Sequence, residues 1–244
     1  FRTDVYDGAT RKPDVTFGTN LSDDLVRRDF TINAMAVRVP ALEFVDEHRG
    51  IVDLAAGRLR TPGPPEQSFR DDPLRMMRAA RFVAQLDVTI ADSTYAAMST
   101  MADRLAIVSP ERIRDELLRL LTAEYPRRGL EVLVDSGLAA VILPELPALR
   151  LEIDEHHRHK DVYEHSLTVL DQAIALEEGD PDPILRLAAL LHDIGKPRTR
   201  RMEPGGGVSF HHHEVVGARM TAKRLRALHF SKAEIEDVAR LVEL

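Results

Sequence analysis

Two arginine-rich stretches constrain this chain more than any other feature of its sequence. Residues 25–36 read Leu-Val-Arg-Arg-Asp-Phe-Thr-Ile-Asn-Ala-Met-Ala, and residues 71–82 read Asp-Asp-Pro-Leu-Arg-Met-Met-Arg-Ala-Ala-Arg-Phe. The second stretch has the signature of a helix start, because proline suits the first turn and carboxylates favour the positive end of the helix dipole. The pattern therefore predicts an ordered helix directly after Pro73.

The charged residues of this predicted helix are regularly spaced. Asp72, Arg75, Arg78 and Arg81 follow one another at i,i+3 steps, so they form a spiral ridge on the helix surface. A guanidinium group presents a planar fork of donors that suits phosphates or base acceptors, and a carboxylate can accept from an exocyclic amine. The ridge therefore indicates either a nucleotide site or a solvent-exposed helix with ion pairs on its surface.

Both stretches resemble signature motifs of the class II RNA nucleotidyltransferases, the family of bacterial CCA-adding enzymes and poly(A) polymerases. Residues 71–82 resemble the helix with which this family selects its nucleotide, with Asp71 in place of the usual Glu. The two motifs occur in the family's order, and the resemblance covers nearly the whole chain. It implies a mainly α, multidomain fold, in which the remnant of an α/β nucleotidyltransferase head precedes an all-helical neck and body and a helical HD domain.

The resemblance also implies a role for each matching residue. Arg28 would contact the incoming triphosphate, and Asp72 and Arg75 would form hydrogen bonds with the edge of cytosine or adenine. Arg78 and Arg81 would hold nucleotide or phosphate from the following turns of the helix.

Other residues are expected to support this site without touching substrate. Asp29 and Asn33 would fix the loop of the first motif. The helix start at residues 109–116 would belong to the neck on which the site rests.

The family's catalytic carboxylates have no counterpart in this sequence. In the family they lie in the head, after a Gly-Ser-type phosphate loop, and bind two Mg²⁺ ions. We expect them upstream of Phe1, in an intact protein of which this chain is an internal piece, and Asp4 and Asp7 are weak candidates to replace them. The chain alone is then expected to select a nucleotide without transferring it.

A second group of residues suggests a metal site. His165 lies in an amphipathic segment, and residues 190–197 read Leu-Leu-His-Asp-Ile-Gly-Lys-Pro. Imidazole and carboxylate ligands suit a divalent metal that activates water. The arrangement resembles the HD-domain metal phosphohydrolases, and it implies that His165, His192 and Asp193 are ligands. A fourth ligand would come from beyond Leu244 or, less plausibly, be Asp237.

Two further histidine clusters flank these residues. One consists of His156, His157 and His159, and the other of His211, His212 and His213. We interpret these six as surface histidines, with His213 as the best candidate for an additional ligand.

Composition limits the class of protein and its partners. The 244 residues are 44% hydrophobic and 30% charged, which is typical of folded domains, and no apolar run is long enough to span a membrane. The absence of cysteine excludes disulfides and thiolate metal sites and suits a cytoplasmic protein. The net charge is −7, yet basic residues gather at residues 196–201 and 219–226, as RNA contacts or as solvated helix faces.

Breaker residues and periodicity predict the order of domains and elements. The Pro-rich residues 61–65 suggest a boundary between residues 1–60 of the head, 61–150 of the neck and body, and 151–244 of the HD domain. One helix is expected from about residue 22, with Leu25, Phe30, Ile32 and Met35 facing inward. Further helices are expected at residues 129–137, 162–176, 184–193, 215–228 and 232–244, and strands at residues 37–39 and 44–46.

These inferences combine into one leading interpretation. The intact protein would be a tRNA nucleotidyltransferase that adds CCA to tRNA 3′ ends from CTP and ATP with Mg²⁺. The alternatives are a poly(A) polymerase of the same family, an HD-type metal phosphohydrolase and an RNA-binding helical module. The sequence leaves the oligomeric state and the identity of any metal in the HD domain open.

Overall fold

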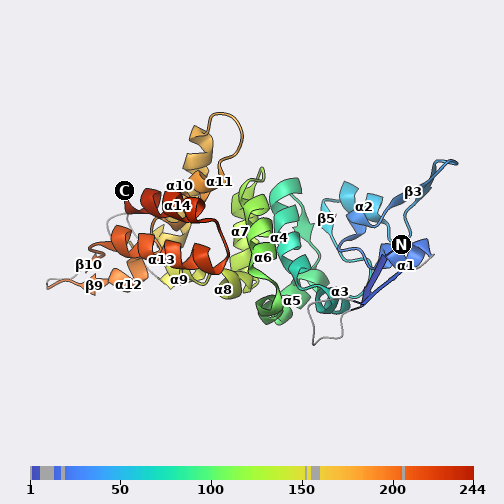
Figure 1. Cartoon of the computed structure of the whole chain (residues 1–244), viewed down its shortest axis with the longest axis horizontal. Helices are drawn as coiled ribbons and strands as arrows, with labels where there is room; N and C mark the ends of the chain where they lie inside the picture. Colours follow the sequence, from blue (N-terminus) through green and yellow to red (C-terminus); the bar gives the residue numbers. More distant parts are fainter. Residues whose placement is uncertain (1, 6–13, 18–19, 152, 155–159, 205–206) are drawn as a thin grey trace.

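The computed structural model describes residues 2–5, 14–17, 20–151, 153–154, 160–204 and 207–244. Their elements follow one another along the long axis of the molecule, from the strands near the N-terminus at one end to helices α10–α14 at the other (Figure 1). Within this part of the chain, no helix combines the length and the apolar character that crossing a membrane requires.

The first part of the chain mixes short strands with short helices. Asp53, which is fully buried, holds it together, because its carboxylate accepts hydrogen bonds from Thr31, Arg58 and Arg60. β1 pairs antiparallel with β2, and β3 with β4. The elements are β1 (Arg2–Val5), β2 (Asp14–Phe17), α1 (Leu21–Val26), the 3₁₀ turn η1 (Thr31–Asn33), β3 (Ala36–Arg38), β4 (Glu43–Val45), α2 (Gly50–Ala55) and β5 (Arg58–Leu59).

The single helix predicted from residue 22 is wrong in its length. α1 ends at Val26, and the chain turns before the short η1. The turn is stabilised because the Asp29 carboxylate accepts a hydrogen bond from the Phe30 N–H, and the Thr31 N–H donates to the Arg60 carbonyl. Three of the four side chains predicted to face inward are buried: Leu25, Phe30 and Ile32. The fourth, Met35, is half-buried.

The second part is almost entirely helical. The predicted helix after Pro73 is confirmed as α4 (Leu74–Leu86), which packs against α6 (Pro110–Leu121) and α7 (Pro126–Asp135). β6 (Thr89–Ile90) pairs parallel with β5 and ties this part to the first. The other elements are α3 (Pro65–Asp71), α5 (Asp92–Met101), η2 (Ala102–Ile107), α8 (Leu138–Ile142) and α9 (Glu145–Ala148).

A glycine lets α7 approach α4 closely. A Cβ atom on Gly129 would lie 2.8 Å from the Ala80 carbonyl oxygen and 2.9 Å from the Ala84 Cβ. Two helices whose backbones come this near leave no space for a side chain between them. Gly129 therefore fixes the packing of the helix that carries the charged ridge.

The third part is a group of helices. α10 has the predicted bounds, and α11, α13 and α14 begin and end within two residues of the predicted ones. α14 begins with a capping box between Ser231 and Glu234. The elements are η3 (Leu149–Leu151), β7 (Ile153–Asp154), β8 (Lys160–Asp161), α10 (Val162–Leu176), α11 (Pro183–Leu191), α12 (Lys196–Thr199), β9 (Arg201–Met202), β10 (Val208–Ser209), α13 (His213–Ala227) and α14 (Lys232–Glu243).

Candidate functional site

The first arginine-rich stretch folds into the end of α1 and the turn that follows it. Arg28 forms an ion pair of 2.9 Å with Asp24, one helical turn earlier, and its side chain stays about half exposed. A guanidinium group in this position can exchange an exposed ion pair for a phosphate, because such pairs contribute little to stability.

Asp29 points the other way, into the protein. Its carboxylate accepts hydrogen bonds from the Phe30 N–H at 2.8 Å, from Asn33 Nδ2 at 3.1 Å and from Arg78 Nε at 2.9 Å. Burial by itself would raise the pKa of Asp29, but the charge and hydrogen bonds of Arg78, with those of Asn33 and Phe30, hold it below its usual 3.8. An ionised Asp29 thus connects this turn to α4, which fits the supporting role expected for Asp29 and Asn33.

Asp72 and Arg75 lie where α3, α4 and α6 meet the turn after α1. Asp72 Oδ2 forms an ion pair of 2.7 Å with Arg112 Nη2 of α6, and its Oδ1 accepts from the N–H of Leu74. Arg75 donates to the Ser68 hydroxyl at 2.8 Å and to the carbonyl oxygen of Arg27. Both side chains are half-buried, so their polar atoms are held in place while remaining open to one side.

The rest of the ridge turns inward. Arg78 donates to Asp29, and Arg81 Nε donates to Glu116 Oε2 of α6 at 2.6 Å. The residues Arg81 and Glu116 are 7% and 4% exposed, and the Arg81 guanidinium stacks 4.3 Å from the centre of the Phe82 ring. The ion pairs on α4 are therefore largely buried and join separate elements, unlike those of a solvated helix face.

Two partners of the ridge were not identified from the sequence. Arg112 and Glu116, one turn apart on α6, bind Asp72 and Arg81 respectively. The available signal was charge within an amphipathic helix: Glu116 lies three residues after Ile113 and four before Leu120, which places it on the apolar face. Its pairing with Arg81, 35 residues earlier, follows from tertiary packing alone.

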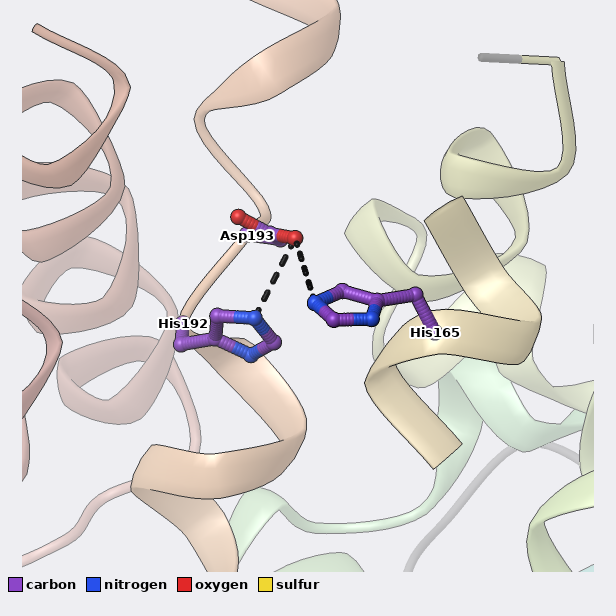
Figure 2. A group of neighbouring side chains, drawn as sticks. All are labelled: His165, His192 and Asp193. Atoms are coloured by element: carbon purple, nitrogen blue, oxygen red, sulfur yellow. Dashed lines mark ion pairs between the residues drawn. The ribbon is translucent and has the colours of Figure 1, made fainter. Parts of the chain in front are cut away.

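His165, His192 and Asp193 come together between α10 and the end of α11 (Figure 2). One ligand atom from each lies within 4.8 Å of the others. Asp193 Oδ2 is 3.1 Å from His192 Nε2 and 3.7 Å from His165 Nε2. Among the residues that the structure describes, these three form the metal-ligand cluster, and Asp237 is exposed on α14 and does not belong to it.

Two other side chains reach the same carboxylate. Lys196 Nζ lies 2.9 Å from Asp193 Oδ2, and His213 Nε2 lies 3.3 Å from Oδ1. Burial by itself would raise the pKa of Asp193, but His192 and Lys196 hold it well below the usual range. Gly195 permits this arrangement, because a Cβ there would lie 2.1 Å from the His213 carbonyl oxygen.

The histidine geometry suits a metal ion. His192 Nδ1 is 2.9 Å from the Ala189 carbonyl oxygen, and His213 Nδ1 is 2.9 Å from that of Phe210. A carbonyl only accepts, so Nδ1 carries the hydrogen and Nε2 is the ring nitrogen that faces Asp193. The carbonyl contact at Nδ1 fixes the ring orientation that metal-ligating histidines adopt, and ring Nε2 atoms that converge with a carboxylate fit a divalent metal.

The remaining predicted histidines divide in two. The side chains of His211 and His212 are 72% and 83% exposed, which agrees with their interpretation as surface residues. His156, His157 and His159 lie outside the described residues, as does Asp7, and the side chain of Asp4 is not described either.

Comparison with known proteins gives the family. Three family models match the chain in order: the "Poly A polymerase head domain" at residues 1–60, the "Probable RNA and SrmB- binding site of polymerase A" at residues 87–149, and the "HD domain" at residues 162–244.

Individual relatives agree with these models. The A-adding tRNA nucleotidyltransferase of Deinococcus radiodurans is 40% identical over 98% of this chain and 56% of its own length. The crystal structure of the Bacillus stearothermophilus CCA-adding enzyme in complex with CTP is 26% identical, with a TM-score of 0.61, over 91% of this chain and 46% of its own. A tRNA nucleotidyltransferase complexed with a primer tRNA and an incoming ATP analog is 25% identical, with a TM-score of 0.53, over 72% of this chain and 50% of its own.

The chain spans about half the length of these relatives. Within that span it carries the three matched segments in the order of the family models and both arginine-rich motifs. The chain therefore belongs to the class II family of CCA-adding enzymes and poly(A) polymerases, in the form that carries an HD domain.

Proposed function

We propose that this chain is the nucleotide-selecting part of a tRNA nucleotidyltransferase that adds CCA to tRNA 3′ ends from CTP and ATP. The observation that carries the proposal is the placement of Asp72 and Arg75 at the junction of α3, α4 and α6, with both side chains held by neighbours and open on one side. The relatives named above support tRNA as the acceptor.

The two side chains match the edge shared by cytosine and adenine. Each of these bases presents an exocyclic amine beside an unprotonated ring nitrogen, whereas uracil and guanine present a carbonyl beside a ring N–H. In the proposed complex the Asp72 carboxylate accepts from the amine, and the Arg75 guanidinium donates to the ring nitrogen. Arg28 contacts the triphosphate through the guanidinium group that now holds Asp24.

Arg78 and Arg81 take a supporting part in this proposal. Their guanidinium groups are engaged by Asp29 and Glu116, so they hold α4 in position beneath the base. Direct contact of either residue with nucleotide or phosphate stays a prediction. The catalytic step is proposed to use Mg²⁺ held by carboxylates outside this chain.

The test is transfer by the full-length protein. Incubated with Mg²⁺ and a tRNA that lacks its CCA end, it is expected to incorporate CTP and then ATP, and to reject UTP and GTP. The double variant Asp72→Ala/Arg75→Ala is expected to lose at least about a hundredfold in kcat/KM for CTP, since two charge-assisted hydrogen bonds are removed. No incorporation by the full-length protein would contradict the proposal.

Product analysis separates the close alternatives. Addition of ATP to a tRNA that already ends in CC, without use of CTP, would indicate A-addition, which the Deinococcus radiodurans relative favours. A long run of adenylates would indicate a poly(A) polymerase. Single-nucleotide resolution of the products on a denaturing gel distinguishes the three outcomes.

The cluster of His165, His192 and Asp193 favours a second function in the same chain. We propose that it binds a divalent metal, which when present would activate water for phosphoester hydrolysis at RNA ends. His192→Ala is expected to abolish metal binding measured by calorimetry, while the exposed His212→Ala leaves it unchanged. Metal binding that is equally strong in His192→Ala would contradict the proposed ligand set, and a metal-bound but inert chain would contradict the hydrolase activity.

A further inference from the structure

A cavity of about 340 Å³ lies where α9 meets α12 and α13. Much of its wall is apolar and comes from three separate segments, since it includes Ala148 of α9, Ile194 before α12 and Met220 of α13. It contains none of the residues of the metal-ligand cluster, although Ile194 directly follows Asp193. Its volume falls at the lower end of the range for pockets that hold small organic ligands.

Positive charge at the cavity exceeds negative charge. Three cations line it, and Glu145 is the one carboxylate among its lining residues. Glu145 is fully engaged, because Arg224 Nε and Nη2 donate to its two oxygens at 2.9 Å each. This bidentate pair joins α9 to α13 and leaves Arg198 and Lys223 without a balancing carboxylate in the cavity wall.

Arg198 and Lys223 are exposed at the mouth of the cavity. Within the described ranges of the chain, neither side chain forms an ion pair or a hydrogen bond. Arg219, one turn before Lys223 on α13, is exposed as well and extends the basic surface away from the cavity. An anion that approaches this face therefore meets free donors next to an apolar wall.

These features select a class of ligand. A bare inorganic anion would use the cations but leave the apolar wall in contact with water, and an uncharged aromatic molecule would do the reverse. A nucleotide satisfies both, because its phosphate can accept from Arg198 and Lys223 while its base packs against Ala148 and Met220. We propose that this cavity binds a nucleotide that carries a terminal phosphate, supplied by an RNA strand or free in solution. Only the RNA source rests on the proposed function.

Methyl NMR of this chain with ¹³C-labelled methionine tests the proposal directly. Met220 lies in the cavity wall, whereas Met76 and Met77 lie on α4 and report on the other nucleotide site. In the presence of a chelator, AMP is expected to shift the Met220 resonance saturably. Adenosine and inorganic phosphate, which each lack half of the recognised group, should bind at least about tenfold more weakly.

Charge variants provide the control. Arg198→Glu/Lys223→Glu should weaken AMP binding at least about tenfold, and Arg198→Gln/Lys223→Gln should weaken it less. Lys232→Glu makes one such charge reversal on exposed α14, outside the cavity, and should leave binding within about twofold of the unchanged protein. The three positions changed by these variants, Arg198, Lys223 and Lys232, are all solvent-exposed, and a thermal melt of each variant checks that it is folded.

An RNA arm, compared with the AMP arm, distinguishes the sources of the nucleotide. A short single strand with a 3′-terminal phosphate that shifts Met220 would identify RNA as the ligand, and a shift with AMP alone would identify a free nucleotide. A Met220 resonance that AMP leaves unmoved, or moves equally in the Glu double variant, would overturn the proposal. Because no transfer reaction is involved, failure here and failure of nucleotide addition by the full-length protein are separate outcomes.

Discussion

At the scale of single residues, burial separates charged side chains that the spacing alone makes equivalent. Asp72, Arg75, Arg78 and Arg81 follow one another at the same interval, yet the first two are half-buried at a junction and Arg81 is almost fully enclosed with Glu116. A buried carboxylate that pairs with such a group is costly to remove, because the remaining charge then has no partner.

Asp29 allows this cost to be measured. Asp29→Asn is expected to lower the free energy of unfolding by about 2–3 kcal/mol at neutral pH, since Arg78 loses its charged partner. The pKa of Asp29 is lower in the folded protein than its usual 3.8. The stabilisation that the ionised Asp29 contributes is therefore complete above pH 3.8 and is lost as the pH falls through the folded pKa. Urea denaturation at several pH values should show the two proteins converging in acid.

A matched control is Asp24→Asn, which removes a carboxylate paired with the exposed Arg28. Its effect should stay below about 1 kcal/mol at every pH. Equal losses for the two variants would show that the Asp29 pair contributes no more than an exposed one.

Arg112 offers a test of how Asp72 is oriented. Arg112→Ala removes the ion pair of 2.7 Å that holds the Asp72 carboxylate, so we expect the full-length protein to lose about tenfold in its preference for CTP over UTP. The ratio of kcat/KM for the two nucleotides measures this preference. Arg119→Ala, on the same helix and more exposed, should leave the ratio unchanged. Loss of activity with an intact ratio would mean that Arg112 supports the fold and not the selection.

At the scale of elements, close helix packing decides whether a glycine-to-alanine substitution stabilises or destabilises the fold. Alanine normally stabilises a helix interior relative to glycine by about 1 kcal/mol. At Gly129, however, the added Cβ would meet the backbone oxygen of Ala80 at 2.8 Å, so Gly129→Ala is expected to destabilise by about 1–3 kcal/mol and lower the melting temperature. Gly217→Ala provides the comparison, because its nearest contacts are 3.4 Å and its effect should be near zero or stabilising. A stabilising Gly129→Ala would contradict the packing of α4 on α7.

The helices also show which parts of the fold can be predicted from the sequence. α10, α11, α13 and α14 were predicted closely, because breaker residues and an apolar stripe are local signals. The interrupted helix at residues 22–35 was missed, since the hydrogen bond from Thr31 to the Arg60 carbonyl comes from a distant part of the chain. The cluster of His165, His192 and Asp193 was anticipated through a motif, and His213 was named as a candidate for an additional ligand. The tight contact at Gly195 that brings His213 to 3.3 Å from Asp193 comes from tertiary packing and could not be predicted.

At the scale of the whole molecule, the first turn of α6 connects two distant regions. Arg112 reaches Asp72 beside α4, while its neighbour Glu111 accepts a hydrogen bond of 2.6 Å from His229 in the loop before α14. Arg114 of the same turn donates to the His229 carbonyl oxygen at 2.6 Å. Consecutive residues on one helical turn thus touch the ridge that we propose selects the nucleotide and the HD domain, so a disturbance of one contact can reach the other through the backbone of α6.

His229→Ala tests this connection. The variant removes the Glu111 contact, and hydrogen exchange is expected to become faster at residues 109–115 and 228–231, while the buried cores of α4 and α11 keep their protection.

The same contact depends on pH. The pKa of Glu111 lies below its usual 4.5, mainly because of its own backbone N–H and His229. The contact is therefore present above pH 4.5 and is lost as the pH falls through the lowered pKa. Lys232→Ala removes only an exposed ion pair with Glu236 in the same region and should leave exchange in α6 unchanged. Faster exchange confined to residues 228–231 would show that α6 holds its first turn without the HD domain, and the two regions would then act independently.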